Sequence, residues 1–240
     1  MLTYLRLEIL RVLRNPMFTG YTIGFPVGFY LLFTTVFAQG PVSTTDFSAY
    51  YMVSMALYGA VGTALTGVGA PIAMERSRGW TRQLALTPLR PRQYVAIKVA
   101  SAGVLSLPVI VAILVAGRLV HHVDLGLGTW LGLVPALWLG ALPFVGLGIA
   151  IGYTFRDEAA QGAALTIYFL LSVAGGLWLP IEAFPGWLAS VAHVLPTYRA
   201  GELSWQLLAG HSPLTGGAVV LLAWAVAFLG LAAWRFRRAA

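Results

Sequence analysis

Long apolar runs alternate with short polar stretches along the whole chain. Each run has about 20 residues or more, the length that an α-helix needs to cross about 30 Å of hydrocarbon. The interiors of the runs contain no Asp, Glu, Lys or Arg, and Lys98 stands at the edge of the third. The pattern therefore predicts an all-α protein with six transmembrane helices, at residues 17–38, 49–74, 97–117, 129–155, 159–180 and 213–234.

The segment before the first run, residues 1–15, has an amphipathic pattern. At 100° per residue, its apolar side chains share one helix face and its polar side chains share the opposite face. The apolar set is Leu2, Leu5, Ile9, Val12 and Leu13, and the polar set is Tyr4, Glu8, Arg11 and Arg14. Pro16 ends the pattern. This predicts a helix in the membrane interface, the alternative being an extension of the first span.

Two of the connections between runs are long enough to have structure of their own. Residues 75–93 are polar and rich in arginine, and Pro88 and Pro91 predict a helix that breaks there and restarts into the third span. Residues 181–212 are half apolar and carry several aromatic side chains. They are too broken for one straight span and too short for two. We expect one or two short re-entrant or interfacial helices there, the alternative being an ordinary loop.

The composition excludes a water-soluble protein. The chain is 59% hydrophobic and only 10% charged, with a mean hydropathy of +0.81. A soluble domain has about 25% charged residues. We therefore interpret residues 1–240 as one integral membrane domain. With so little polar surface, the net charge of +7 does not indicate binding to nucleic acid. The absence of cysteine excludes disulfides and thiolate metal sites.

The charge instead predicts topology. With six spans, thirteen of the fifteen Lys and Arg residues fall on one side, and only Arg118 and Arg199 fall on the other. Lys and Arg collect on the cytoplasmic side of membrane proteins. Both termini and the 75–93 segment are therefore predicted to be cytoplasmic.

The sequence offers little chemistry of its own. The spans have no interior ionisable groups, so coupling to an ion gradient is disfavoured. There is no Walker P-loop, no H-E-x-x-H and no G-x-S-x-G, which disfavours an enzyme. His121, His122 and Asp124 fall on different faces of a helix and are more typical of a solvated loop than of a metal site. We predict no catalytic residue, no metal site and no cofactor bound by this chain.

A chain without its own energy source requires a partner, and the 75–93 segment is the natural place for one. Its leucines Leu84, Leu86 and Leu89, rimmed by arginines, suggest a protein docking surface. A solvated loop whose arginines only set topology explains the charge equally well.

The spans are uncharged but rich in aromatic side chains, which suits an apolar or amphipathic substrate. The alternative is that these side chains face lipid or pack the core. The candidates are Phe25, Tyr30, Tyr51, Tyr58, Tyr168 and Trp178.

The stretch "MERSRGWTRQLALTPLRPRQYVAIK" resembles a motif of the ABC type-2 transporter permeases, E-R-E-x-G-T-x-x-x-L-x-x-T-P-L followed by Tyr or Leu and a Lys. Ser77 and Trp80 depart from it. "RNP" before the first span and "GGLWLPIEAFPGWLASVAHVLPTYRAGEL" also resemble the family, so the likeness covers nearly the whole chain. The residues that fit the motif are Glu75, Arg76, Gly79, Leu84, Thr87, Pro88, Leu89, Tyr94 and Lys98.

The resemblance implies a half-transporter of six spans in the bacterial inner membrane. A second half, identical or related, completes the pathway, and a separate P-loop ATPase binds ATP and Mg. Drugs, antibiotics or lipid-like molecules would move outward. In that picture a coupling helix seats in the ATPase, and the coupling residues are Glu75, Arg76, Gly79, Leu84, Pro88 and Leu89. An ATP-independent transporter or channel is the main alternative, and a membrane-embedded enzyme or scaffold is a weaker one.

Overall fold

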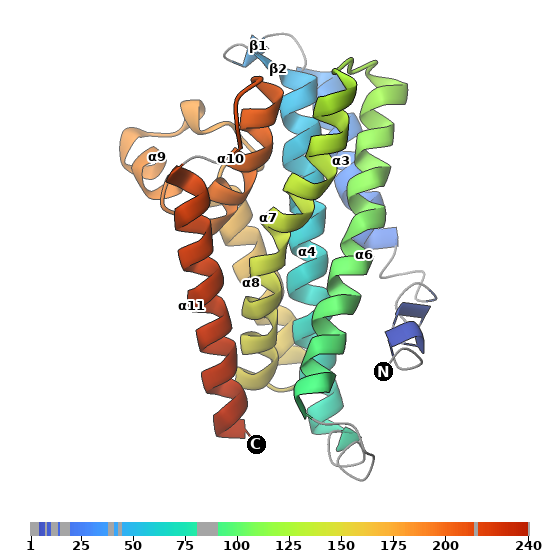
Figure 1. Ribbon diagram of the computed structural model, residues 1–240, viewed down its shortest axis with the longest axis vertical. Helices are drawn as coiled ribbons and strands as arrows, with labels where there is room; N and C mark the ends of the chain where they lie inside the picture. Colours follow the sequence, from blue (N-terminus) through green and yellow to red (C-terminus); the bar gives the residue numbers. More distant parts are fainter. Residues whose placement is uncertain are drawn as a thin grey trace.

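The computed structural model describes residues 5–7, 9–10, 14, 20–37, 41–42, 45–80, 91–213 and 216–239. Six helices lie side by side in a bundle (Figure 1), which confirms the all-α prediction. They are α3 (Phe25–Phe37), α4 (Phe47–Ser77), α6 (Pro91–Val120), α7 (Leu127–Thr154), α8 (Asp157–Ala174) and α11 (Gly216–Ala239). The strands β1 (Pro41–Val42) and β2 (Thr45–Asp46) form a two-residue antiparallel ladder between α3 and α4.

In the part of the chain that the structure describes, four helices are long and apolar enough to cross a membrane by themselves. They are Phe47–Ser77, Gln93–Val120, Leu127–Thr154 and Gly216–Arg238, which correspond to four of the six predicted spans. The described residues of the first run start with a π-helix, η1 (Gly20–Gly24), just before Pro26, whose missing N–H disturbs the regular bonding. The predicted span 159–180 extends beyond the end of the helix that the structure shows there. Helix α8 ends at Ala174 because Gly175 and Gly176 follow, and Gly176 has a left-handed φ of +79°.

Helix α4 is the centre of the bundle, and nearly all of its apolar part is buried. Figure 1 shows it between α6 and α7 with α8 and α3 behind. Its contact with α7 is made through glycines. A Cβ on Gly148 would lie 2.8 Å from the carbonyl oxygen of Leu65, and one on Gly152 would lie 2.6 Å from that of Gly69. Small residues of this kind allow membrane helices to approach closely.

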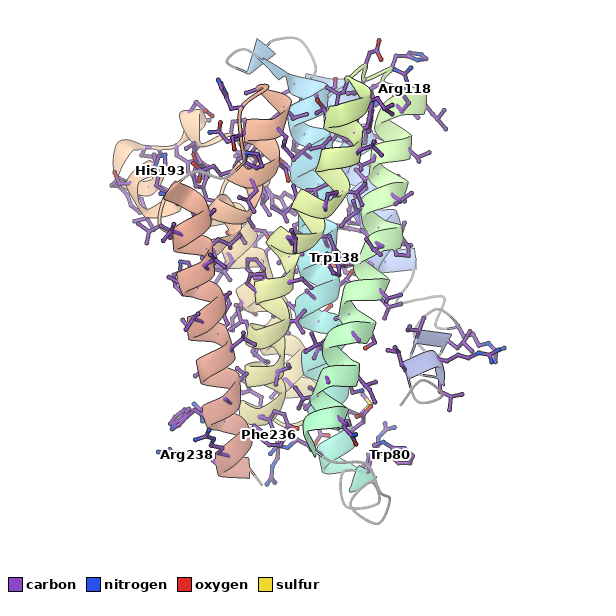
Figure 2. The ribbon with its side chains drawn as sticks, viewed as in Figure 1. Trp80, Arg118, Trp138, His193, Phe236 and Arg238 are labelled. Carbon is purple, nitrogen blue, oxygen red and sulfur yellow. The ribbon has the colours of Figure 1, made fainter. Side chains whose placement is uncertain are left out.

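A side-chain hydrogen bond joins α6 to α7 close to a proline. Helix α6 contains Pro108, which cannot donate a backbone hydrogen bond to the preceding turn. Five residues before it, the carbonyl of Gly103 accepts a hydrogen bond of 2.8 Å from the indole N–H of Trp138 on α7. This bond joins α6 to α7 in the middle of the bundle, where Figure 2 places Trp138.

Between α8 and α11 the chain forms three short helical elements: η2 (Ile181–Ala183), α9 (Gly186–Ala192) and α10 (Pro196–Leu208). Helix α10 packs against α4, where the indole N–H of Trp205 donates to the hydroxyl of Ser54 over 3.1 Å. The hydroxyl of Thr197 donates to the carbonyl of Leu171 on α8 over 2.5 Å. These contacts fix the 181–212 segment onto one end of the bundle.

The two ends of the bundle differ in what they carry. Trp80 and Arg238 lie at one end, whereas Arg118 and His193 lie toward the other (Figure 2). The end of α11 and the described start of the 75–93 segment therefore lie at the same end of the bundle, as the charge distribution predicts. Of the predicted interface helix at 1–15, the structure describes helical turns at 5–7 and 9–10 and the turn residue Arg14. The rest of that prediction lies outside the described residues.

Candidate functional site

A buried ion pair lies where α4 ends and the 75–93 segment begins. The Nζ of Lys98 lies 2.7 Å from Oε1 of Glu75, and the side chains are 1% and 5% exposed. The second carboxylate oxygen, Oε2, accepts a hydrogen bond of 2.5 Å from the hydroxyl of Tyr94. Both oxygens of the buried carboxylate thus have a partner, as a buried charge requires.

The local sequence explains this arrangement. Tyr94 and Lys98 are four residues apart on α6, so they lie on the same face of the helix one turn apart. Glu75 is in the last turn of α4, and α4 and α6 are antiparallel neighbours in the bundle (Figure 1). The three side chains therefore close the base of the loop that connects the two helices.

Arg76 ties the same end of α4 to a third helix. Its Nη1 donates to the carbonyl of Gly152 over 2.8 Å, and its guanidinium lies 5.0 Å from the ring centroid of Tyr153. Gly152 is in the last turn of α7, where carbonyls lack intrahelical partners and the helix dipole favours a cation. Glu75 and Arg76 thus point to opposite neighbours, α6 and α7. We call these five side chains, with the Gly152 carbonyl, the α4 clamp: Glu75, Arg76, Tyr94, Lys98 and Tyr153.

Beyond the clamp the chain turns at Gly79. Its φ of +71° is left-handed, a conformation that glycine adopts without strain. Trp80 follows and is 41% exposed. A hollow of about 290 Å³ is lined here by Met74, Glu75, Arg78 and Trp80. The other predicted coupling residues, Leu84, Pro88 and Leu89, lie outside the described residues.

Five of the six aromatic candidates for a substrate pathway form one connected aromatic cluster between α3, α4 and the end of α8. The sixth, Tyr30, is buried, and its ring lies 5.2 Å from that of His121. The rings of Tyr58 and Tyr168 stack at 4.5 Å, and Trp178 lies edge-on to Tyr58 at 5.4 Å. Phe25 lies 6.2 Å from Tyr58. Tyr51 joins the cluster through Phe33, Phe29 and Trp178, at 5.4, 5.6 and 5.1 Å for the successive pairs.

The cluster is packed rather than hollow in this single chain. Tyr51, Tyr58 and Tyr168 are buried, and the hydroxyl of Tyr168 donates to the carbonyl of Tyr58 over 2.9 Å. The cavity beside Phe25, Tyr58 and Tyr168 has about 20 Å³, room for a single water. Core packing, the alternative named above, accounts for these three tyrosines here. Phe25 and Trp178 are half-buried and closer to the surface.

Sequence reasoning did not identify the clamp itself. In the sequence, Tyr94 and Lys98 stand out only as matches to the family motif, with Lys98 at the edge of a span, and nothing marks Gly152 or Tyr153. Because the interiors of the runs contain no acidic residue, the sequence places Glu75 outside them. In the structure it is at a helix end, but it is buried and paired. The spacing of Tyr94 and Lys98 is a usable signal, since a buried Lys needs an acidic partner. Nothing in the sequence near Arg76 indicates α7 as its partner.

Comparison with known proteins identifies the family of this chain. Residues 26–234 match the family described as ABC-2 family transporter proteins. The chain is also 31% identical over 233 residues to YvfS of Bacillus subtilis (strain 168), whose name describes it as a transport permease. That match covers 96% of this chain and 94% of the relative. The chain is therefore a multi-pass membrane permease that belongs to the ABC-2 transporter family.

Proposed function

We propose that this chain is the membrane half of a bacterial ABC exporter, driven by ATP that a separate P-loop ATPase binds with Mg and hydrolyses. The observation that carries this proposal is the α4 clamp. It fastens the base of the 75–93 segment to α6 through Glu75 and to α7 through Arg76. A partner that moved this segment would therefore move three helices of the bundle together.

The clamp gives Glu75 and Arg76 a role different from direct contact with the ATPase. Glu75 is 5% exposed, so its carboxylate is occupied inside the chain. We assign Glu75 and Arg76 to positioning the segment. The residues that would contact the ATPase are the exposed Trp80, Gly79 in the turn, and the predicted coupling residues Leu84, Pro88 and Leu89.

The direction, substrate and topology belong to the same proposal. All six runs would cross the inner membrane, with both termini and the 75–93 segment in the cytoplasm. A homodimer would complete the pathway. The half-buried Phe25 and Trp178, with Tyr51, Tyr58 and Tyr168 packed behind them, support an apolar or amphipathic substrate such as a drug, an antibiotic or a lipid. Because the cluster is closed in the single chain, passage would require α3 and α8 to move apart or to face the second half.

The test is a mild-detergent purification of the tagged chain from its native cell, with the bound proteins identified by mass spectrometry. We expect a P-loop ATPase in about equal amount. Export of a lipophilic dye from inverted vesicles should then require ATP. Recovery of the chain without an ATPase, together with dye flux in liposomes that contain the chain alone, would refute the proposal and favour an ATP-independent transporter.

A further inference from the structure

An apolar groove runs along the outside of the bundle between α6 and α7, at the end that carries Arg118. It has about 390 Å³ and is lined by Val111, Leu114, Val115, Arg118, Trp130 and Val134. On α6 the lining residues follow the spacing i, i+3, i+4 and i+7, so they form one helix face. Leu114 is its buried floor, and Val111 and Val115 are rims that are 46% and 47% exposed.

The side chains that line the groove favour an apolar ligand over water. Apart from Arg118, every lining side chain is aliphatic or aromatic. The volume is more than twice the roughly 150 Å³ of a cavity that holds benzene. The groove opens sideways at the level of the predicted spans, where the surrounding molecules are lipids. Other lipid-facing surfaces, such as the exposed side of α11 at Val219, Leu222 and Val226, line none of the hollows described above.

Arg118 provides a cation at the head of the groove. Both of its hydrogen bonds use Nη1, one to Oδ1 of Asp124 at 2.7 Å and one to the carbonyl of Val123 at 3.3 Å. A guanidinium has five N–H donors, so its other nitrogens retain capacity for a phosphate. The side chain is 53% exposed.

The loop after α6 is shaped to hold this arginine. His122 has a left-handed φ of +51°, an unfavourable conformation for a residue with a side chain. The turn folds the chain back so that Val123 is buried and its N–H donates to the carbonyl of Gly117 over 3.1 Å. The sequence predicts one other cation on this side of the membrane, Arg199. Its guanidinium pairs with Glu202, and its side chain is only 20% exposed.

We propose that the groove binds one phospholipid of the leaflet opposite the 75–93 segment. An acyl chain lies in the groove against Leu114, Trp130 and Val134, and the phosphate binds the guanidinium of Arg118. Charge complementarity and the apolar lining carry this assignment. It does not depend on which substrate the permease moves or on the identity of its ATPase.

The experiment uses the full-length chain in nanodiscs of phosphatidylethanolamine and phosphatidylglycerol. The probe is a phosphatidylethanolamine that carries a photoactivatable diazirine in its acyl chain. Peptide mapping should find severalfold more label on 111–118 and 130–134 than on the exposed face of α11. Val115→Trp, which fills the groove, should abolish this excess. Val226→Trp, at a valine of α11 that is 70% exposed, is the matched control and should leave it unchanged.

A second readout tests the headgroup contact without filling the groove. Native mass spectrometry after detergent extraction should find one retained phospholipid, and Arg118→Gln should weaken its retention about tenfold, the effect of losing one hydrogen bond to a charged group. Arg237→Gln, at the other end of the bundle, is the control. Equal labelling of the groove and α11, or unchanged retention in Arg118→Gln, would overturn the proposal. Efficient disulfide formation between two Val115→Cys chains would assign the groove to a second copy instead.

Discussion

The ammonium of Lys98 on α6 lies 2.7 Å from the carboxylate of Glu75 on α4, and both side chains are buried. The pair stands where the 75–93 segment leaves one helix and enters the next. With the hydroxyl of Tyr94 on the other carboxylate oxygen, it joins the two stems of the segment at their base. A movement of the segment would therefore reach both helices together.

Removing one member of the pair should be worse than removing both. Glu75→Gln or Lys98→Met alone leaves a buried charge without its partner, which costs about 3–5 kcal/mol. The double variant Glu75→Gln/Lys98→Met removes both charges and should recover most of that stability. Thermal unfolding of the four proteins in detergent measures the coupling. Additive losses in the double variant would show that the two charges do not interact.

Stability and coupling should separate in this double variant. If the pair transmits movement, Glu75→Gln/Lys98→Met should insert and bind its ATPase normally but transport more slowly per ATP hydrolysed. The ratio of dye export to ATP hydrolysis in reconstituted vesicles is the readout. A wild-type ratio would restrict the pair to a structural role.

Arg76 and Arg78 offer a matched comparison two residues apart. Arg76→Ala removes the hydrogen bond to the carbonyl of Gly152 and the contact with the Tyr153 ring, whereas Arg78 is exposed. We expect Arg76→Ala to lower the free energy of unfolding by about 1.5–3 kcal/mol, as for a hydrogen bond to a charged group. Arg78→Ala should change it by less than about 0.5 kcal/mol. Equal effects would contradict the clamp.

Leu84→Asp tests the predicted docking surface. A carboxylate in place of an apolar anchor should abolish ATPase-driven export, because a buried unpaired charge is costly at an interface. Expression and membrane insertion should stay at wild-type levels, as judged by membrane fractionation. Wild-type export and wild-type stimulation of the ATPase would remove Leu84 from the coupling surface.

The glycine contact between α4 and α7 should not accept a methyl group. In Gly152→Ala the new Cβ would lie 2.6 Å from the carbonyl oxygen of Gly69, so the helices must separate, which costs about 1–3 kcal/mol. Gly230→Ala on α11 is the control, because its Cβ would meet nothing within 4 Å. A lower midpoint of thermal unfolding for Gly152→Ala only is the expected result. If both variants unfold at the wild-type temperature, the close approach is not a determinant of stability.

Trp178 tests the substrate proposal because it is half-buried and bridges Phe29, Tyr58 and Phe169. Trp178→Ala should weaken export of aromatic dyes while basal ATP hydrolysis by the complex stays unchanged. Trp224→Ala on α11 is the control. Although its indole donates to the carbonyl of Val194, it lies outside the cluster. If both variants export the dyes equally well, the cluster has only a packing role.

The sequence by itself determined the class of this protein and most of its helices. In a bilayer every backbone polar group must be bonded within the protein, so a long apolar run free of charge can only be a helix or buried structure. The runs that became α4, α6, α7 and α11 follow this rule directly. The order and spacing of the motif residues around Glu75 and Lys98 also indicate the family from the sequence alone.

Only the tertiary structure decided which faces meet. A span that is apolar on all sides carries no signal for its buried face, so the central place of α4 and its glycine contact with α7 could not be read from hydropathy. The ends of α3 and α8 depended on local bonding at Pro26 and Gly176 rather than on apolar length. Likewise, Glu75 and Arg76 are adjacent in the chain, but a helix turns successive side chains by 100°, and the packing of α6 and α7 gave each its own partner.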